Sequence, residues 1–367
     1  MKTCLMLKDE PVLEVDNYNC RILDYDRLPV SLRYHDVNYD DAMHYWTRSR
    51  CISMSRTYAK NLAALYHGIR HDSYSMAKLY HFATLTDSYW MKDEVENLKW
   101  KDVSLFDNPF DKQISRTALT GEYTDISLPY GRLHTPETTT QGMSAKCWVK
   151  ENSGIYLYKI GRKEIAASEI LTQLNIPHVD YTEADPNVLA EIARDKKIRE
   201  IETAGEIVAR CPLITSEDIS IVTWEDLQVG CDRNDITPIK YIENEPAYKQ
   251  MQIADYILGN SDRHEQNWGF FMDNNTGRIT GFCPLMDHDH AFDNTENIPS
   301  QTSEKKETLK EAAFRSIQSS NLNIQIKRPH YLTDSEWFGV QARTSLLRDF
   351  QLYKSQNVEG NDCRNKQ

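Results

Sequence analysis

The pattern of hydrophobic and polar residues predicts short helices and strands joined by polar loops. After Pro246, apolar residues return at the spacing of a helix that packs in a core: Met251, Ala254, Ile257 and Leu258. Gly259 then favours the end of that helix. Residues 268–272 and 279–285 are apolar runs around a turn rich in Asp, Asn and Gly, which is typical of a β-hairpin. The chain between Gly259 and Trp268 is therefore expected to be a loop that joins a buried helix to a hairpin.

A second block has the same clear patterning. Residues 147–150 and 155–160 alternate around an Asn-Ser-Gly turn and predict two paired strands. Residues 164–174 follow with the periodicity and composition of a helix. Lys159 lies near the end of the second strand, and Glu164 and Glu169 lie in the helix. A strand lysine and a helix glutamate are the pair that positions ATP phosphates in protein kinases, although such a pair is common in proteins of other kinds.

Polar residues in the loop after residue 259 add a chemical pattern. Asp262 and Asn267 stand five positions apart, which is the interval between the base and a magnesium-binding amide in a kinase catalytic loop. Asp287 follows after the hairpin, which can return it beside Asn267. One carboxylate would orient an acceptor hydroxyl, while the amide and the second carboxylate would hold magnesium across the phosphates of ATP. Asp289 is a further candidate metal ligand.

Composition narrows the class of protein. The 367 residues suffice for two or three lobes, and a net charge of −12 disfavours an extended nucleic-acid or anionic-membrane surface. The sequence lacks an apolar run of about 18 residues, and charges come too early at the N-terminus for a signal peptide. Eight cysteines are scattered without a CxxC pair, which favours reduced thiols and a cytoplasmic location. The first third of the chain carries no chemistry that we can assign.

The order of these features along the chain resembles the HipA-type serine/threonine kinases of bacteria, over about residues 130 to 355. The catalytic loop of that family, GN-[TS]-D-x-H-x-x-N, is matched at Gly259, Asn260, Ser261, Asp262, His264 and Asn267. Its metal motif, P-[LI]-[YF]-D, is matched at Pro284, Leu285 and Asp287, with Met286 in place of the aromatic residue.

The resemblance extends to a phosphate-binding loop, S-x-x-G-x-x-x-K. Thr139, Gly142 and Lys146 match it, with threonine in place of serine. A serine three residues before the loop glycine is autophosphorylated in that family, so the resemblance makes Thr139 the candidate for autophosphorylation. Counting back from the turn at residues 175–177 makes Glu164, and not Glu169, the counterpart of the helix glutamate.

The resemblance implies an α+β, bilobal protein-kinase-like fold with a β-rich N-lobe, a helical C-lobe and an extra N-terminal α/β region. We expect an accessory region at residues 1–130, the N-lobe at 131–226 and the C-lobe at 227–367. Residues 219–227 stand where the hinge between the lobes should bind adenine. ATP and Mg²⁺ are the implied cofactors.

The expected mechanism assigns a role to each motif residue. Asp262 is the base, Asn267 and Asp287 hold Mg²⁺, and Lys159 contacts the phosphates. The residues expected at the bound nucleotide are Gly142, Lys146, Lys159, Glu164 and His264, the histidine through support of its loop. The expected partners are ATP, a protein substrate with a serine or threonine acceptor, and an antitoxin-like protein, because some relatives are toxins paired with a DNA-binding antitoxin.

Other classes of function stay open on sequence alone. The chain could be a catalytically silent kinase fold used for binding, although the residues for catalysis are present. The DRHxxN string also resembles phosphoinositide-type kinases, so a lipid or small-molecule kinase is a second alternative. A metal-dependent phosphohydrolase is a third, suggested by His288 and His290 on either side of Asp289. A requirement for Mg²⁺ and ATP would separate a kinase from a hydrolase.

Overall fold

The computed structural model has a mixed α and β fold with several antiparallel sheets. It describes residues 2–16, 19–33, 39–66, 70–123, 134–232, 242, 244–294, 297–303, 305–320 and 322–364, apart from the side chains of 39–42, 232 and 354–364. The mixed composition expected from the sequence is confirmed. Among the helices in these ranges, none is both long and apolar enough to span a bilayer.

The chain forms two compact units, each built from three segments. Unit 1 comprises Met1–Gly161, Tyr181–Ile236 and Phe270–Gly281, and unit 2 comprises Arg162–Asp180, Thr237–Gly269 and Phe282–Gln367. The first expected functional boundary, at residues 130 and 131, lies outside the described residues. The second, at 226 and 227, falls within helix α9 (Trp224–Asp232). The division into accessory region, N-lobe and C-lobe stays a prediction.

The N-terminal part of unit 1 is built on an antiparallel sheet. Its strands are β1 (Lys2–Leu7), β2 (Glu10–Asp16), β3 (Asn19–Ile22) and β4 (Tyr89–Asp93), in the order β3-β2-β1-β4. Leu5, Leu13 and Trp46 are among the buried residues of the core beneath it. The helices of this part are η1 (Val30–Leu32), α1 (Tyr39–Arg48), α2 (Ala59–Ala64), α3 (Ser73–Leu79), α4 (Trp100–Val103) and α5 (Lys112–Thr120).

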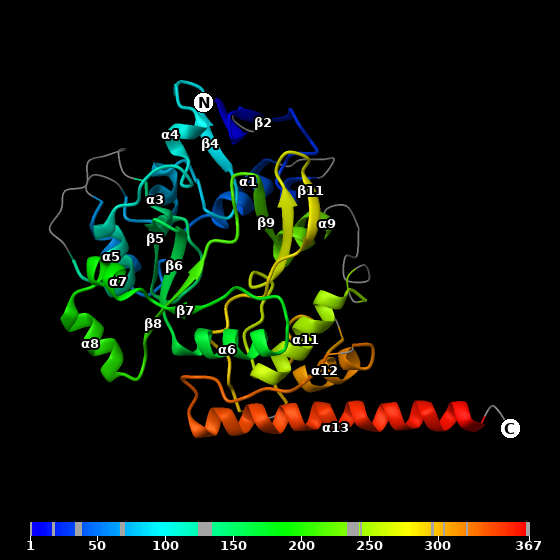
Figure 1. Cartoon of the computed structure of the whole chain (residues 1–367). Helices are drawn as coiled ribbons and strands as arrows, with labels where there is room; N and C mark the ends of the chain where they lie inside the picture. The colour runs from blue at the N-terminus through cyan, green and yellow to red at the C-terminus, as the bar shows by residue number, and fades with distance from the viewer. Residues whose placement is uncertain are drawn as a thin grey trace. The chain divides into compact units, whose positions relative to one another are not determined.

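A second antiparallel sheet of unit 1 carries two of the expected site residues (Figure 1). Its strands are β5 (Lys146–Glu151), β6 (Gly154–Ile160), β7 (Thr182–Glu183) and β8 (Val208–Pro212), in the order β5-β6-β8-β7. The alternation of side chains places Cys147 and Tyr158 in a buried cluster with Leu119 of α5. Lys146 and Lys159, which pair directly across β5 and β6, therefore share the opposite face. Helices η2 (Pro136–Thr138), α7 (Pro186–Ile192) and α8 (Asp195–Thr203) complete this part.

The hairpin expected after the catalytic loop joins a third sheet. Its strands are β9 (Ile219–Thr223), β10 (Gly269–Asp273) and β11 (Arg278–Phe282), in the order β11-β10-β9. The carboxylate of Asp273 accepts hydrogen bonds from the amides of Asn275 (2.9 Å) and Thr276 (2.8 Å), which closes the turn between β10 and β11. The hairpin predicted from the sequence is thus confirmed, within two or three residues at its ends.

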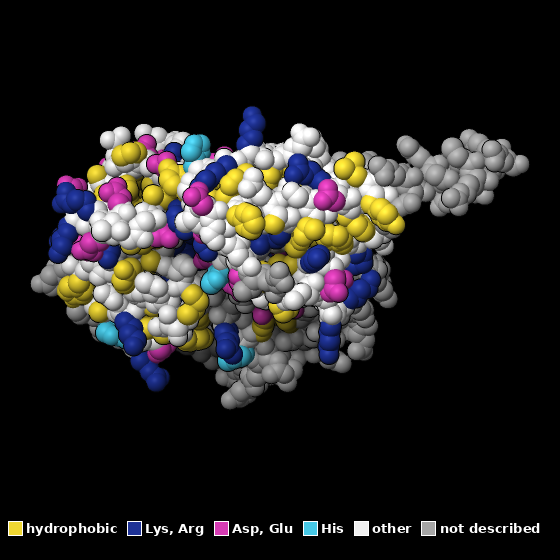
Figure 2. All heavy atoms as spheres, turned by 90° about the horizontal axis from the view of Figure 1, so that it is seen from below, with side chains coloured by type: hydrophobic (Ala, Val, Ile, Leu, Met, Phe, Trp, Pro, Cys, Tyr) yellow, Lys and Arg dark blue, Asp and Glu magenta, His cyan; other side chains and the backbone are white. Residues whose placement is uncertain are grey.

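Unit 2 is mainly helical. It contains α6 (Arg162–Gln173), α11 (Pro246–Leu258), α12 (Leu309–Ile317) and α13 (Asp334–Arg364), and α11 packs against α12 and α13 (Figure 1). The ring of Phe314 on α12 contacts Tyr256 of α11 and Phe350 of α13, at centroid distances of 6.1 and 4.7 Å. Figure 2 looks onto the side where α13 lies, and there hydrophobic side chains are interspersed with charged ones. Those exposed on α13 include Phe338, Leu346, Leu352 and Tyr353.

Candidate functional site

The end of α11 sets the start of the expected catalytic loop. Pro246 opens the helix, and Gly259 ends it in the left-handed conformation at φ 62°. A Cβ on residue 259 would collide with the carbonyl oxygen of Asp293, so only glycine fits there. The buried side chain of Asn260 donates to Asp255 (Nδ2 to Oδ1, 3.3 Å) and accepts from the amide of Asp262 (3.3 Å). The helix end therefore fixes the backbone at Asp262.

The loop itself is closed by hydrogen bonds between its motif residues. The amides of His264 and Asn267 donate to the carbonyl oxygens of Asp262 (2.9 Å) and His264 (3.0 Å). The side-chain amide of Asn267 donates to the carbonyl oxygen of Asp262 (3.0 Å), so its Oδ1 is the atom left for a cation. His264 Nδ1 accepts from the amide of Gln266 (3.2 Å), and its role in supporting the loop stays a prediction. The Asp262 side chain is 41% exposed, so its carboxylate is open to solvent.

Arg263 connects this loop to the metal motif. Its side chain is 1% exposed, and Nη1 donates to the carbonyl oxygens of Asn267 (2.9 Å) and Met286. Nη2 donates to His288 Nδ1 (3.0 Å), which requires the proton of a neutral His288 to be on Nε2. Nε donates to Asp255 (3.1 Å). Burial raises the pKa of the Asp255 carboxyl, and the nearby guanidinium lowers it by less, so the net shift is upward. One arginine thus holds Asn267 and the residue before Asp287 in fixed positions.

The metal motif is also tied to the chain that follows α6. The amide of Leu285 donates to the carbonyl oxygen of Pro177 (3.0 Å), and the amide of Val179 donates to that of Leu285 (2.8 Å). Asp287 then adopts a left-handed conformation at φ 58°, which aspartate tolerates better than most residues. The strained residue is the one that the sequence predicts to bind a metal, which is where such backbone conformations often occur.

Three carboxylates converge in this part of unit 2. Oxygen atoms of Glu164, Asp287 and Asp289 lie within 4.8 Å of one another, and Oε2 of the fully buried Glu164 accepts from the amide of His288 (3.0 Å). Like charges at this separation repel, so a divalent cation would stabilise them. Carboxylate oxygens are the ligands that Mg²⁺ takes, and the residues present therefore fit it. Glu169, by contrast, accepts from the amide and ring of His330 (2.8 and 2.9 Å).

The two lysines expected at the phosphates lie on one face of the β5–β8 sheet in unit 1. Lys159 is 1% exposed, and its amine lies 5.5 Å from the ring centroid of Tyr181. Lys146 is its cross-strand partner. Adjacent positive charges on one sheet face favour an anionic ligand. Because Lys159 and Glu164 belong to different units, the ion pair between them stays a prediction.

The expected phosphate-binding loop precedes β5. Gly142 has φ 97°, and a Cβ there would overlap the amine of Lys146, so the glycine and the lysine of the motif are in close contact. The hydroxyl of Thr139 is buried and donates to the carbonyl oxygen of Ala83 (2.8 Å). Phosphorylation of Thr139 would require this segment to leave its position.

Two residues of the site were missed from the sequence. The sequence motifs assign no role to Arg263 and do not include Asp255. The available signal was helical spacing, since Asp255 shares the buried face with Met251 and Leu258. A carboxylate on an apolar helix face predicts a buried cationic partner, and Arg263 is the nearest arginine in sequence.

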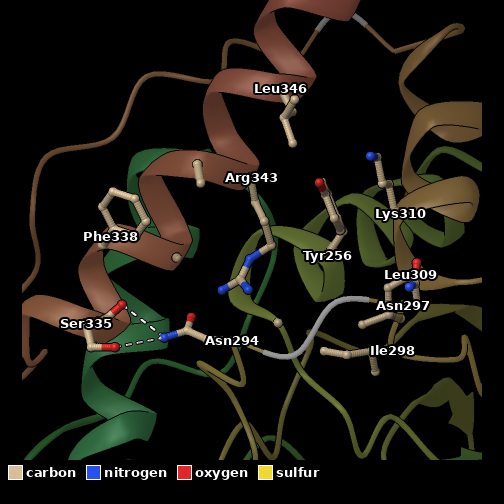
Figure 3. A pocket seen from close by; sticks show the side chains of 13 residues that line it. Tyr256, Asn294, Asn297, Ile298, Leu309, Lys310, Ser335, Phe338, Arg343 and Leu346 are labelled. Carbon is tan, nitrogen blue, oxygen red and sulfur yellow. Dashed lines mark hydrogen bonds between the residues drawn. The ribbon is translucent and has the colours of Figure 1, made fainter.

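A cavity of about 440 Å³ lies among α11, α12 and α13 (Figure 3). Arg343 of α13 lines it and donates to the carbonyl oxygens of Ile257 (3.0 Å) and Asp293 (2.8 Å). Asn294 donates to the backbone oxygen of Ser335 (3.0 Å). These bonds hold the segment after Asp289 against both α11 and α13.

No family model matches the chain, and no curated protein matches it in sequence. Similar folds do occur among the solved structures. The protein HipA of Shewanella oneidensis MR-1, solved as a toxin–antitoxin system with HipB and operator DNA, aligns with a TM-score of 0.53 at 10% identity. The alignment covers 95% of this chain and 96% of HipA. The proinflammatory kinase CtkA of Helicobacter pylori has a TM-score of 0.41 at 13% identity, covering 59% of this chain and 95% of CtkA.

The fold of the chain is therefore similar to that of HipA. The resemblance to HipA-type kinases is confirmed at the level of the fold. The structural similarity to HipA also includes the N-terminal region. The resemblance in sequence motifs covers only about residues 130 to 355.

Proposed function

We propose that the protein transfers the γ-phosphoryl group of ATP to a serine or threonine hydroxyl of another protein. The observation that carries this proposal is the position of Arg263, which links the catalytic-loop residue Asn267 to the metal-motif residue Met286. A buried arginine with this set of bonds orders the residues around a reaction centre before any substrate arrives, and preorganised charge is the main source of catalysis in phosphoryl transfer.

Each residue of the loop has a defined task in this reaction. Asp262, exposed and fixed through its backbone, orients the acceptor hydroxyl and takes its proton as the new O–P bond forms. Asn267 and Asp287 would hold Mg²⁺, with Asp289 as a third ligand. Bound there, Mg²⁺ supplies positive charge to the phosphate oxygens. The hydroxyl oxygen attacks the γ-phosphorus, and the bond from this phosphorus to the bridging oxygen of ADP breaks.

The lysines of unit 1 have a complementary task. Lys159 contacts the phosphates and is oriented by Glu164, while Lys146 and the backbone at Gly142 cover them. This arrangement implies a bilobal enzyme in which residues 219–227 bind adenine.

A protein partner is a further part of this proposal. HipA of Shewanella oneidensis was solved with HipB, and an antitoxin-like protein is the corresponding candidate here. The fold does not identify the acceptor protein, and phosphosite mapping is the experiment that would identify it.

Incubation with radiolabelled ATP and Mg²⁺ tests the activity. Asp262→Ala should reduce incorporation on the order of 10²–10³-fold. Glu265→Gln is a matched control, because Glu265 is an exposed carboxylate in the same loop. Folded Asp262→Ala protein with wild-type turnover would contradict the assignment of the site. ATP binding without turnover in the wild type would favour the silent kinase fold, and labelling of lipid instead of protein would favour the phosphoinositide-type alternative.

A further inference from the structure

The segment between α1 and α2 runs along the expected phosphate-binding loop. The amide of Ile52 donates to the carbonyl oxygen of Thr138 (3.1 Å), and the amide of Thr57 donates to that of Met143 (3.0 Å). The side chain of Gln141 returns two bonds, from Nε2 to the carbonyl oxygens of Ser49 and Cys51, each 2.8 Å. The N-terminal region, to which the sequence assigned no chemistry, is therefore bonded to the loop along its length.

Arg56 is the central residue of these contacts. It is 3% exposed, and its guanidinium donates to three carbonyl oxygens of the loop, those of Glu137 (3.4 Å), Thr140 (3.4 Å) and Lys146. Burial lowers its pKa to about 10, so the side chain is still protonated at neutral pH and keeps all its donors. The carboxylate of Glu137 is close enough to raise that pKa and so favour the charged form.

These three carbonyl groups bracket the residues that would touch phosphate. Glu137 and Thr140 precede Gly142, and Lys146 follows it at the start of β5. The same segment also contains Thr139, which is anchored to Ala83. One side chain therefore fixes both ends of the loop and leaves its tip at Gly142 against the amine of Lys146.

We propose that Arg56 is a positioning residue and that residues 49–57 form a strap that preorganises the phosphate-binding loop for ATP. Fixing the backbone of a flexible loop costs free energy for each residue. A loop already ordered by the strap binds ATP without that cost, so affinity for ATP depends on the N-terminal region. The inference rests on the proposed function, because it takes residues 139–146 as the part that binds phosphate.

Two variants remove bonds between the strap and the loop, one by a change in the strap and one by a change in the loop. Arg56→Met removes the guanidinium, and Gln141→Ala removes an exposed loop side chain whose loss leaves the core intact. Arg50→Met is matched to the first, because Arg50 is a buried arginine of the same segment that bonds to Phe82, Asp87 and Tyr89 outside the loop. Gln113→Ala is matched to the second as an exposed glutamine of α5.

The first measurement does not depend on activity. Hydrogen exchange at the amides of Ile52 and Thr57, which donate to the loop, should become faster in Arg56→Met and Gln141→Ala than in their controls. The second is steady-state kinetics. The KM for ATP should rise about tenfold in Arg56→Met and about threefold in Gln141→Ala, the scale of one or two hydrogen bonds, with kcat little changed. Arg56→Lys, which keeps the charge, should lie between Arg56→Met and the wild type.

The outcomes separate the two proposals. A wild type without ATP turnover contradicts the kinase assignment. Normal wild-type turnover with an unchanged KM in Arg56→Met and Gln141→Ala contradicts the strap alone. An equal rise in KM in Arg50→Met, whose bonds lie outside the loop, contradicts the role of Arg56 as the positioning residue.

Discussion

Arg263 and Asp255 form an ion pair from which water is excluded. The distance from Nη2 to Oδ1 is 3.1 Å, and each side chain is 1% exposed. Such a pair contributes little net stability, because desolvating two charges offsets most of their attraction. Its value here is geometric, since Asp255 fixes the arginine whose other donors hold Asn267 and Met286.

Removing one member of this pair should be costly. Arg263→Met leaves Asp255 charged and buried, so the free energy of unfolding should fall by about 3–5 kcal/mol. Urea denaturation measures this change, with Arg278→Met on the exposed edge of the hairpin as control. A loss below about 1 kcal/mol would mean that water or another residue replaces the guanidinium.

The carboxylate cluster predicts a graded dependence on metal. Asp287→Asn should abolish transfer, whereas Asp289→Asn should raise the Mg²⁺ concentration needed for half-maximal activity, because one of several oxygen ligands loses its charge. Titration with Mg²⁺ at saturating ATP measures this shift, and Glu265→Gln should leave the curve unchanged. An Asp289→Asn curve identical to wild type would remove Asp289 from the metal site.

The sheet lysines should differ in effect. Lys159→Met should raise the KM for ATP and lower kcat, because its charge faces the phosphates in the proposed mechanism. Lys150, whose amine donates to the carbonyl oxygen of Phe106 (2.6 Å), should matter only for packing. Steady-state kinetics of both variants, alongside thermal unfolding, provide the comparison. Equal kinetic effects at both positions would contradict the assigned role of Lys159.

Autophosphorylation is expected at Thr139. The phosphate would bring about −1.5 to −2 charges to a buried position, so the loop should leave its site and activity should fall. Mass spectrometry of protein incubated with Mg²⁺ and ATP identifies the site, and Thr139→Val should remove the modification. An unmodified TTTQG peptide at full activity would contradict this prediction and leave the proposed kinase activity intact.

The elements around the site could be predicted because their signals are local. The strands around Lys159, the helix with Glu164 and the helix before Gly259 each carry a clear period and a turn or stop residue. The loop that contains Asp262 and Asn267 could be predicted for the same reason, because both residues belong to one short stretch of consecutive positions.

The contacts that join distant segments could not be predicted. Arg56 lies about 80 residues before the loop that it contacts, and no periodicity links the two. The convergence of Glu164 with Asp287 likewise depends on how the chain after α6 pairs with Leu285. Such long-range pairings are set by tertiary packing, which a single sequence expresses only weakly.

The discontinuous composition of the two units has a consequence for folding during synthesis. The chain passes from one unit to the other five times, after residues 161, 180, 236, 269 and 281. Unit 1 is therefore incomplete until residue 281 has left the ribosome, and unit 2 until α12 and α13 have followed. A nascent chain arrested before the β10–β11 hairpin would expose unfinished cores in both units, and the protein should depend on chaperones until the hairpin and these two helices are made.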